Sequence, residues 1–317
     1  MAPGNRKDPK RADWSESQFS IMEFARMFPD DDTCLNYLWQ TRYALDDQGS
    51  AHCARCEEVR TFKKYEGKQQ RQAWSCTACG HHVYPTAGTI FHKSSTSLQL
   101  WFYAMYLMSS TRCGISAKQL ERELGVTYKT AWRMFTLIRN ELMDEDGGPL
   151  SGEVEVDEMY VGGRPRLRDQ RTPAARLAHY HSKTAVFGAV ERGGRVKAHV
   201  VPSVYGPTLQ NAVRSTVVTG ATVYTDKAKQ YHSLERHGFD HHSIDHGARV
   251  YVSGNVHTQT IEGFWSLVKR GISGTHHAVS PKWLQGYLNE YAWRYNHRDD
   301  PRGMFALLLL RAANPGR

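Results

Sequence analysis

The sequence contains no long hydrophobic run, and this absence excludes a membrane-spanning helix. The longest apolar stretch, at residues 100–108, has nine residues, whereas a transmembrane helix needs roughly 20. Residues 1–13 are charged and lack the apolar segment that a secretory signal requires. We therefore expect a cytoplasmic protein with no membrane partner.

Cysteine and acidic charge are also in short supply. The 317 residues include only six cysteines, and 41 Lys and Arg residues outnumber 32 Asp and Glu residues to give a net charge of +9. A basic chain is compatible with a nucleic-acid partner, although many basic proteins bind none. Hydrophobic residues make up 40% of the chain, which is enough to build cores and excludes general disorder. The length suits two or three domains, at roughly 100–200 residues each.

Four of the six cysteines form two pairs with the spacing of a zinc site: Cys53, Cys56, Cys76 and Cys79. Two thiolates in one tight turn reach the same ion, and two such turns complete a tetrahedron around Zn²⁺. The alternative is a pair of disulfides, which are typical of secreted proteins, and nothing else in the sequence has that character. We predict one structural Zn²⁺ in a zinc ribbon, with Gly80 completing the second turn.

Short strands at 60–65 and 72–74 are expected between the two cysteine pairs. A ribbon of this size cannot bury a core of its own, so its folding should depend on the metal. The other two cysteines, Cys34 and Cys113, are expected to be ordinary buried residues.

From residue 98 onwards the apolar pattern becomes helical. A buried helix is expected at 98–108, followed by a short helix that a capping box of Ser116 and Gln119 begins. Gly125 predicts a turn, and Thr127 is suited to cap a longer helix at 128–141. This is the layout of a helix-turn-helix, whose second helix would present four residues to DNA: Tyr128, Lys129, Thr130 and Arg133. A purely structural helical hairpin remains the alternative.

The C-terminal half mixes strands and helices, and acidic residues recur among them. Strands are expected at 153–161, 186–190, 196–201 and 221–225, and helices at 207–218 and 260–270. Acids lie on the first strand, at the end of the fourth, Asp226, and on the later helix, Glu262. Three converging carboxylates suit two Mg²⁺ ions, which activate a nucleophile and stabilise the leaving oxygen of a phosphate displacement.

Two alternatives stay open for these acids. Taken singly, each is as consistent with a surface charge, and the first strand is as consistent with a solvated edge. On that strand Glu155 shares the face of Asp157, whereas Glu158 lies opposite. The spacing does not reveal which of the three binds metal.

Five stretches of the sequence resemble those of a known family. They are EVDEMYVGG at 155–163, YTD at 224–226, VHTQTIEGFWS at 256–266, ISAKQL at 115–120 and TYKTAW at 127–132. Together they resemble DDE-class insertion-sequence transposases, and more narrowly the ISXO-type family, over residues 19–298. The chain departs from the family pattern at Ala54, where a proline usually follows the first cysteine, and in the segment 43–50.

The resemblance implies a mixed α/β fold, with an RNase H-like catalytic domain preceded by a zinc ribbon and a helix-turn-helix. It selects Asp157, Asp226 and Glu262 as ligands of two Mg²⁺ or Mn²⁺ ions. It assigns Lys269 to transposon-end DNA, with Arg270 beside it, and places His246 and His257 near the active site. The implied activity is cleavage at the ends of an insertion sequence and joining to target DNA, by a dimer or larger assembly in the bacterial cytoplasm at the nucleoid.

A basic stretch at 164–183 lies between the first two strands of this half and is broken by two prolines. We expect it to clamp DNA phosphates through four arginines, unless it is merely a solvated loop: Arg164, Arg166, Arg168 and Arg171. The expected segments are a helical segment at 1–48, the ribbon at 49–92, the helix-turn-helix at 93–148, the catalytic domain at 149–300 and a tail at 301–317.

Two other functions remain open. One is a domesticated zinc-ribbon regulator that binds DNA without catalysis. The other is an RNase H-like nuclease that cleaves DNA without joining it.

Overall fold

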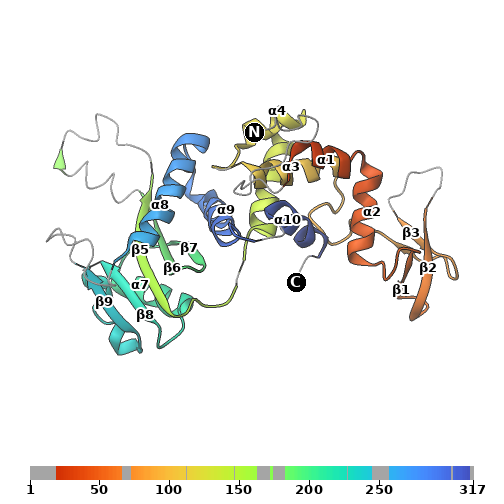
Figure 1. Ribbon diagram of the computed structural model, residues 1–317. Coiled ribbons are helices and arrows are strands. Elements are labelled where there is room, and N and C mark those ends of the chain that lie inside the picture. The colour runs from red at the N-terminus through yellow and green to blue at the C-terminus, as the bar shows by residue number, and fades with distance from the viewer. Residues whose placement is uncertain are drawn as a thin grey trace, which may run out of the picture. The chain divides into compact units, whose positions relative to one another are not determined.

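The computed structural model describes residues 19–65, 73–111, 113–145, 147–162, 172–173, 183–226, 228–244, 257–300 and 303–314 (Figure 1). These residues combine helices with two β-sheets, which confirms the expected mixed α/β class. They form two compact units: Thr111–Asp300 is one, and the chain before and after it makes up the other. No helix in the described ranges is long and apolar enough to cross a membrane.

The first unit has four helices among its described residues: α1 (Ile21–Met27), α2 (Asp31–Arg42), α3 (Leu98–Ser110) and α10 (Met304–Ala313). Asp30 caps α2 by accepting the amide N–H of Thr33 at 2.8 Å. Phe305 of α10 packs its ring against Phe24 and Phe28, with ring centroids 5.9 and 6.1 Å apart. A helix from beyond residue 300 therefore completes a core that is built mainly from the first 110 residues.

A four-stranded antiparallel sheet of this unit, visible in orange in Figure 1, carries the cysteine pairs at the ends of two of its strands and in the turns that follow them. Its strands run in chain order as β1 (Ser50–Cys53), β2 (Glu58–Lys64), β3 (Trp74–Cys76) and β4 (His82–Val83). Trp74 of β3 stacks on Trp39 of α2, with ring centroids 4.9 Å apart and planes inclined by 2°. This aromatic pair fastens a sheet with little core of its own to the neighbouring helix.

The second unit begins with α4 (Ala117–Leu124) and α5 (Tyr128–Leu137), which continues as a π-helical turn at Ile138–Leu142. Gly125 ends α4 with φ +63°, and Thr127 caps α5 by accepting the amide N–H of Thr130. The helices and the turn thus form where the sequence predicted them. The capping box forms only in part: Ser116 accepts the amide N–H of Gln119, but the side chain of Gln119 donates to Glu123 instead of returning to Ser116.

A buried ion cluster ties this helical segment to α9 (Leu284–Asn296). Glu290 is fully buried and accepts hydrogen bonds from Arg139 Nε at 2.7 Å and from Arg294 Nη2 at 2.8 Å. The Arg139 guanidinium lies between the rings of Phe135 and Tyr287, 3.5 and 3.7 Å from their centroids. Burial opposes ionisation of Glu290, but the two arginine charges outweigh it and lower the pKa of its carboxyl to about 2.

The second unit also holds a five-stranded sheet in the order β7-β6-β5-β8-β9. Its strands are β5 (Glu153–Val161), β6 (Thr184–Glu191), β7 (Val196–Val201), β8 (Thr222–Asp226) and β9 (Asp240–Ile244). β5, β6 and β7 pair antiparallel, whereas β8 and β9 run parallel to β5. Because β5 is the central strand, it is not the solvated edge that the sequence left open. β9 is a strand that the sequence did not predict.

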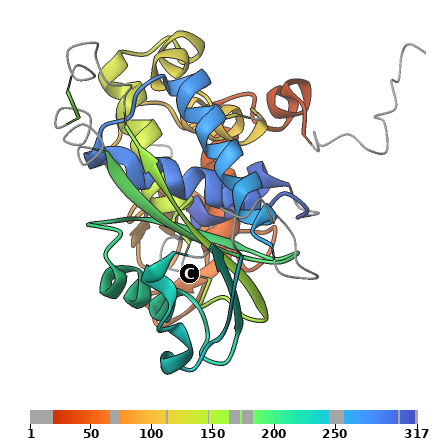
Figure 2. The same ribbon diagram turned by 90° about the vertical axis from the view of Figure 1, so that its left-hand side faces the viewer.

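Helices cover both faces of this sheet (Figure 2). On one face α7 (Gly206–Thr216) packs over Val154 and Val156 of β5. On the other face α8 (Gln259–Gly271) and α9 pack over Met159. Alternate residues of β5 therefore point to different helices, and each acid on the strand is committed to one of two environments.

Candidate functional site

The three acids singled out by the sequence lie on three neighbouring elements of the second unit. Asp157 is in the middle of β5, Asp226 is the last residue of β8, and Glu262 is in the first turn of α8. The parallel pairing of Glu155 with Tyr224 places Asp157 and Asp226, each two residues further on, at adjacent positions of neighbouring strands. The sheet and α8 thus bring together carboxylates that are far apart in the sequence.

The electrostatics of Asp157 reflect this convergence. Its side chain is half-buried, whereas Glu262 is exposed. Burial raises the pKa of Asp157 to about 6, and the negative charges of Asp226 and Glu262 add to the rise. Among the described residues, only the cysteine cluster brings three or more ligand atoms within 4.8 Å of one another. A closer approach of three anions needs a cation between them, because like charges repel.

Trp265 of α8 holds Asp157 in place. Its indole Nε1–H donates to Asp157 Oδ2 at 3.0 Å. Gly188, the partner of Asp157 on β6, leaves the space for the indole: a Cβ there would collide with Trp265 Cζ2. Sequence reasoning placed Trp265 on an apolar helix face and missed this bond. The available signal was the indole N–H itself, since a buried tryptophan usually needs an acceptor.

Glu158 occupies the opposite face of β5, as the sequence predicted. Its Oε2 accepts the hydroxyl of Tyr231 at 2.6 Å, within the core that packs against α7. Burial raises the pKa of Glu158 to about 7, and the charges of Asp157 and Asp226 add to this effect. The strand thus separates Glu158 from the face that contacts α8.

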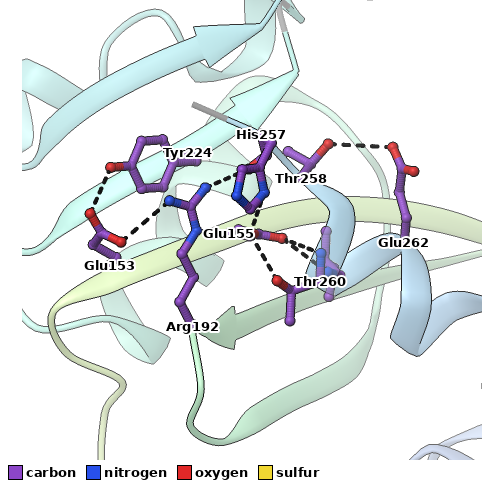
Figure 3. Close-up of polar contacts among 9 residues, drawn as sticks. Glu153, Glu155, Arg192, Tyr224, His257, Thr258, Thr260 and Glu262 are labelled. Atoms are coloured by element: carbon purple, nitrogen blue, oxygen red, sulfur yellow. Dashed lines mark hydrogen bonds and ion pairs between the residues drawn. The ribbon is translucent and has the colours of Figure 1, made fainter. Parts of the chain in front are cut away.

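Glu155 shares the face of Asp157, but its surroundings are different (Figure 3). It is fully buried and is enclosed by donors from Arg192 and from the start of α8, including the amide N–H of Thr260. His257, expected from the sequence to lie near the site, approaches Glu155 with its Nδ1 3.1 Å from Oε1. Besides burial, the charges of Asp226 and Glu262 raise the pKa of Asp157, whereas donors surround Glu155.

The basic residues predicted to contact DNA lie on exposed helix faces wherever the structure describes them. Lys269 and Arg270 are exposed in the last turn of α8, two helical turns beyond Glu262. On α5, Tyr128, Lys129 and Arg133 are exposed and Thr130 is half-buried. The four arginines of the basic stretch lie outside the described residues, as does His246: Arg164, Arg166, Arg168 and Arg171.

The four paired cysteines form one cluster in the first unit. Their Sγ atoms all lie within 4.8 Å of one another, and those of Cys53 and Cys79 are 3.6 Å apart. Each pair is followed by a residue in the left-handed region, Glu57 with φ +58° and Gly80 with φ +69°. The amide N–H of each donates to the carbonyl of the first cysteine of its pair, at 2.8 and 2.9 Å. Two equivalent turns therefore present four thiols to one point.

All six cysteine thiols are free, so the disulfide alternative is not realised. Cys34 is buried as expected, whereas Cys113 is only half-buried because it lies in the turn before α4. Neither belongs to the cluster. Burial opposes ionisation of Cys76, but hydrogen bonds from the Cys79 and Ala78 amides outweigh it and lower the pKa of the thiol to about 7, whereas hydrogen bonding to Cys79 and burial raise the pKa of Cys56 to about 12. A lowered pKa favours the thiolate form that binds metal.

Comparison with known proteins gives two matches and one negative result. Residues 149–296 match the ISXO2-like transposase domain family, a range that contains the five-stranded sheet, α7, α8 and α9. A protein described as an uncharacterized protein in transposable element ISH50, from Halobacterium salinarum, is 30% identical over 272 residues, which cover 82% of this chain and 88% of the relative. No solved structure matches the chain.

Proposed function

The chain belongs to the ISXO-type insertion-sequence transposases, and on that premise we propose that it binds the ends of its element, cleaves DNA strands and joins them to target DNA. The observation that carries the proposal is the placement of Asp157, Asp226 and Glu262 on the central strand, its parallel neighbour and the helix over them. The order of the sheet, three antiparallel strands continued by two parallel ones, supports an RNase H-like catalytic domain.

The donor set fits divalent cations. Asp157, Asp226 and Glu262 offer only carboxylate oxygens, the ligands that Mg²⁺ and Mn²⁺ prefer. The raised pKa of Asp157 reflects burial and repulsion among the three acids, which a cation would relieve. Two ions held there would polarise the scissile phosphate and activate first water and then the freed 3′-hydroxyl as nucleophiles. The residues of the chain act by position: Trp265 orients Asp157, and α8 carries both Glu262 and Lys269.

The cysteine cluster fits one structural Zn²⁺. Four thiols at mutual distances within 4.8 Å, presented by two equivalent turns, match the tetrahedral Cys₄ site of a zinc ribbon. The ion would hold β1 to β4 together, and its role would be folding rather than chemistry.

The proposed DNA contacts lie on three surfaces. α4 and α5 would act as the helix-turn-helix, with Tyr128, Lys129, Thr130 and Arg133 toward the DNA, because α5 presents them on its accessible side. Lys269 and Arg270 would contact the transposon end beside the acids. The basic stretch at 164–183, which follows β5, would clamp phosphates. Binding both ends of the element implies at least a homodimer in the assembled complex. The proposal also includes the cytoplasmic location and the division into segments at 1–48, 49–92, 93–148, 149–300 and 301–317 that the sequence predicted.

The test is strand cleavage of DNA that carries the sequences flanking the reading frame. Asp157→Asn, Asp226→Asn and Glu262→Gln should each lower the cleavage rate by roughly a thousandfold or more, since each removes a metal ligand. End binding in a mobility-shift assay should stay within about twofold of wild type. Glu153→Gln is the matched control, because Glu153 is an exposed acid on the same strand.

The products separate the proposal from its alternatives. Joined DNA supports a transposase, and cleaved but unjoined DNA supports an RNase H-like nuclease. Binding without cleavage, in Mg²⁺ and in Mn²⁺, supports a regulator. A wild-type cleavage rate in any one of the three variants would remove that residue from the site.

A further inference from the structure

A buried acid without a role in the proposed chemistry lies two residues from Asp157. Glu155 is fully buried in the sheet, and it is far from α8 in the sequence but adjacent to it in space (Figure 3). Its Oε2 accepts the amide N–H groups of Thr260 at 2.7 Å and of Ile261 at 3.1 Å. Its Oε1 accepts the hydroxyl of Thr260 at 3.0 Å and Nε of Arg192 at 2.9 Å.

These bonds replace a local helix cap. The first amides of a helix have no partner within the helix, and a side chain at the preceding residue usually satisfies one of them. Thr258 is the N-cap residue of α8, and its side chain makes no such bond. Glu155, on the central strand, serves these amides instead, and its negative charge complements the positive end of the helix dipole.

We call the bonds from Glu155 to Thr260 and Ile261 the anchor of α8. Arg192 balances the negative charge of Glu155 and adds further bonds to this anchor. Its guanidinium ion-pairs with the buried carboxylate and donates from Nη2 to the carbonyl of His257, just before α8, at 2.9 Å. It also ion-pairs with Glu153 at 3.3 Å and lies 4.0 Å from the ring centroid of Tyr224 on β8. One cation thus links β5, β8 and the approach to the helix.

The anchor fixes the helix that carries Glu262. Glu262 follows Ile261 directly, so the bonded amides and the third acid lie in the same helical turn. Trp265, one turn on, makes the second polar contact between α8 and β5, at Asp157. Both oxygens of Glu155 are engaged by donors, and ligation of a metal would require them to release the helix.

We propose that Glu155 is a positioning residue that anchors the N-terminus of α8 to the central strand and thereby sets Glu262 opposite Asp157, and that it is not a metal ligand. This inference rests on the proposed function for the purpose of the anchor. The anchor itself is a property of the protein alone. The proposal also assigns metal binding to Asp157 and not to Glu155, two acids that the sequence spacing did not distinguish.

Hydrogen exchange on the full-length protein without metal or DNA tests the anchor. Glu155→Gln removes the charge with little change of shape, and exchange at Thr260 and Ile261 should accelerate by about tenfold or more, as for loss of a charge-assisted hydrogen bond. Glu153→Gln, which changes an acid that contacts Arg192 but not α8, should leave these amides within about twofold of wild type. Thr260→Val, which removes only the hydroxyl donor, is the milder variant if Glu155→Gln does not fold, and it should give a smaller acceleration of the same amides.

Calorimetric titration with Mn²⁺ tests the positioning of Glu262. Glu155→Gln and Glu262→Gln should weaken Mn²⁺ binding by similar factors, on the order of tenfold, and the double variant should be no weaker than the weaker single one. A merely structural role would make the two effects multiply, and a ligand role would make Glu155→Gln lose binding as completely as Asp157→Asn. Either result overturns the inference, as does unchanged exchange at Thr260 and Ile261. Failure of the proposed function looks different: Mn²⁺ binding would then be indifferent to Asp157→Asn, whatever the exchange result.

Discussion

Gly188 on β6 is paired with Asp157 on β5. The absence of a side chain at Gly188 is as important to the site as the carboxylate of Asp157. The indole of Trp265 fills the space that a side chain at Gly188 would occupy. The orientation of Asp157 therefore depends on a residue with no functional group. Size, and not only chemistry, limits which residues the site tolerates.

Gly188→Ala should displace Trp265 and break its bond to Asp157. The added methyl group would overpack the site, and we expect the free energy of unfolding to fall by about 1–3 kcal/mol. The cleavage rate should fall as well, because Asp157 loses its fixed orientation. Thermal unfolding and the end-cleavage assay measure the two effects. Gly263→Ala on α8 is the matched control: its Cβ would meet nothing within 4 Å, so stability should be unchanged or slightly higher.

Glu290 should make stability depend on pH at the acidic end. Its pKa is lowered from 4.5 to about 2 in the folded protein, so the carboxylate contributes stability above pH 4.5 that is lost as the pH falls toward 2. The contribution is on the order of 3 kcal/mol. Glu290→Gln leaves Arg139 and Arg294 buried without their counter-charge and should cost about 3–5 kcal/mol at pH 7.

Denaturant unfolding at a series of pH values checks this prediction. The gap in unfolding free energy between wild type and Glu290→Gln should narrow below pH 4.5. A gap that stays constant down to pH 2 would contradict the lowered pKa.

Individual residues show where sequence reasoning reaches its limit. The alternation of β5 correctly separated Glu158 from Glu155 and Asp157, because strand geometry is local. The difference between Glu155 and Asp157 was not predictable, since it arises from partners on α8 about a hundred residues away. Only the folded chain shows that donors surround one acid and other acids surround its neighbour.

At the scale of elements, apolar periodicity predicted well wherever it was strong. α3, α7 and α8 lie within two residues of the expected bounds at both ends, because each buries a continuous apolar stripe. β9 was missed because Asp240, His241, His242 and Ser243 give it no apolar pattern, and hydrogen bonds to β8 hold it in place. An edge strand needs only one paired side, so its sequence carries little signal.

Removal of the proposed Zn²⁺ should unfold the four-stranded sheet and leave the second unit folded. A strong chelator should abolish hydrogen-exchange protection across β1 to β4, whose small core rests on the rings of Phe62 and Trp74 against Trp39. Fluorescence of that tryptophan pair should change at the same time, whereas the unit Thr111–Asp300 should keep its protection. Cys76→Ser should reproduce the chelated state without chelator. Protection that survives chelation would remove the metal from the explanation of this fold.

At the scale of the whole molecule, chain order and spatial order differ. The first unit is assembled from segments on both sides of the second, and α10 supplies Phe305 to its core. From the sequence, residues 301–317 were expected to form a short tail; their place in a core was not predictable, because pairing of distant segments leaves no local pattern. The family resemblance also extended only to residue 298, so it was silent on this helix.

Phe305→Ala should therefore destabilise the first unit alone. Truncation of a buried aromatic ring typically costs about 3–5 kcal/mol, and the ring contacts Phe24, Phe28 and Tyr106. Leu310→Ala on the same helix is the control, because Leu310 is 37% exposed and its loss should cost far less. Hydrogen exchange resolved by segment should show the loss in α1, α2 and α3. An equal loss in the second unit would contradict their independence.

The position of α10 near the C-terminal end also determines the order in which the two units can fold during synthesis on the ribosome. α1, α2 and α3 emerge early, but Phe305 is translated only after the whole of Thr111–Asp300, which takes roughly 10–40 s at usual elongation rates. During that interval the second unit is free to fold, while Phe24 and Phe28 lack their contacts with Phe305 of α10. A nascent chain can therefore complete the five-stranded sheet that carries Asp157 and Asp226 before it completes the first unit. Chains released before α10 is translated would lack a helix of that unit's core.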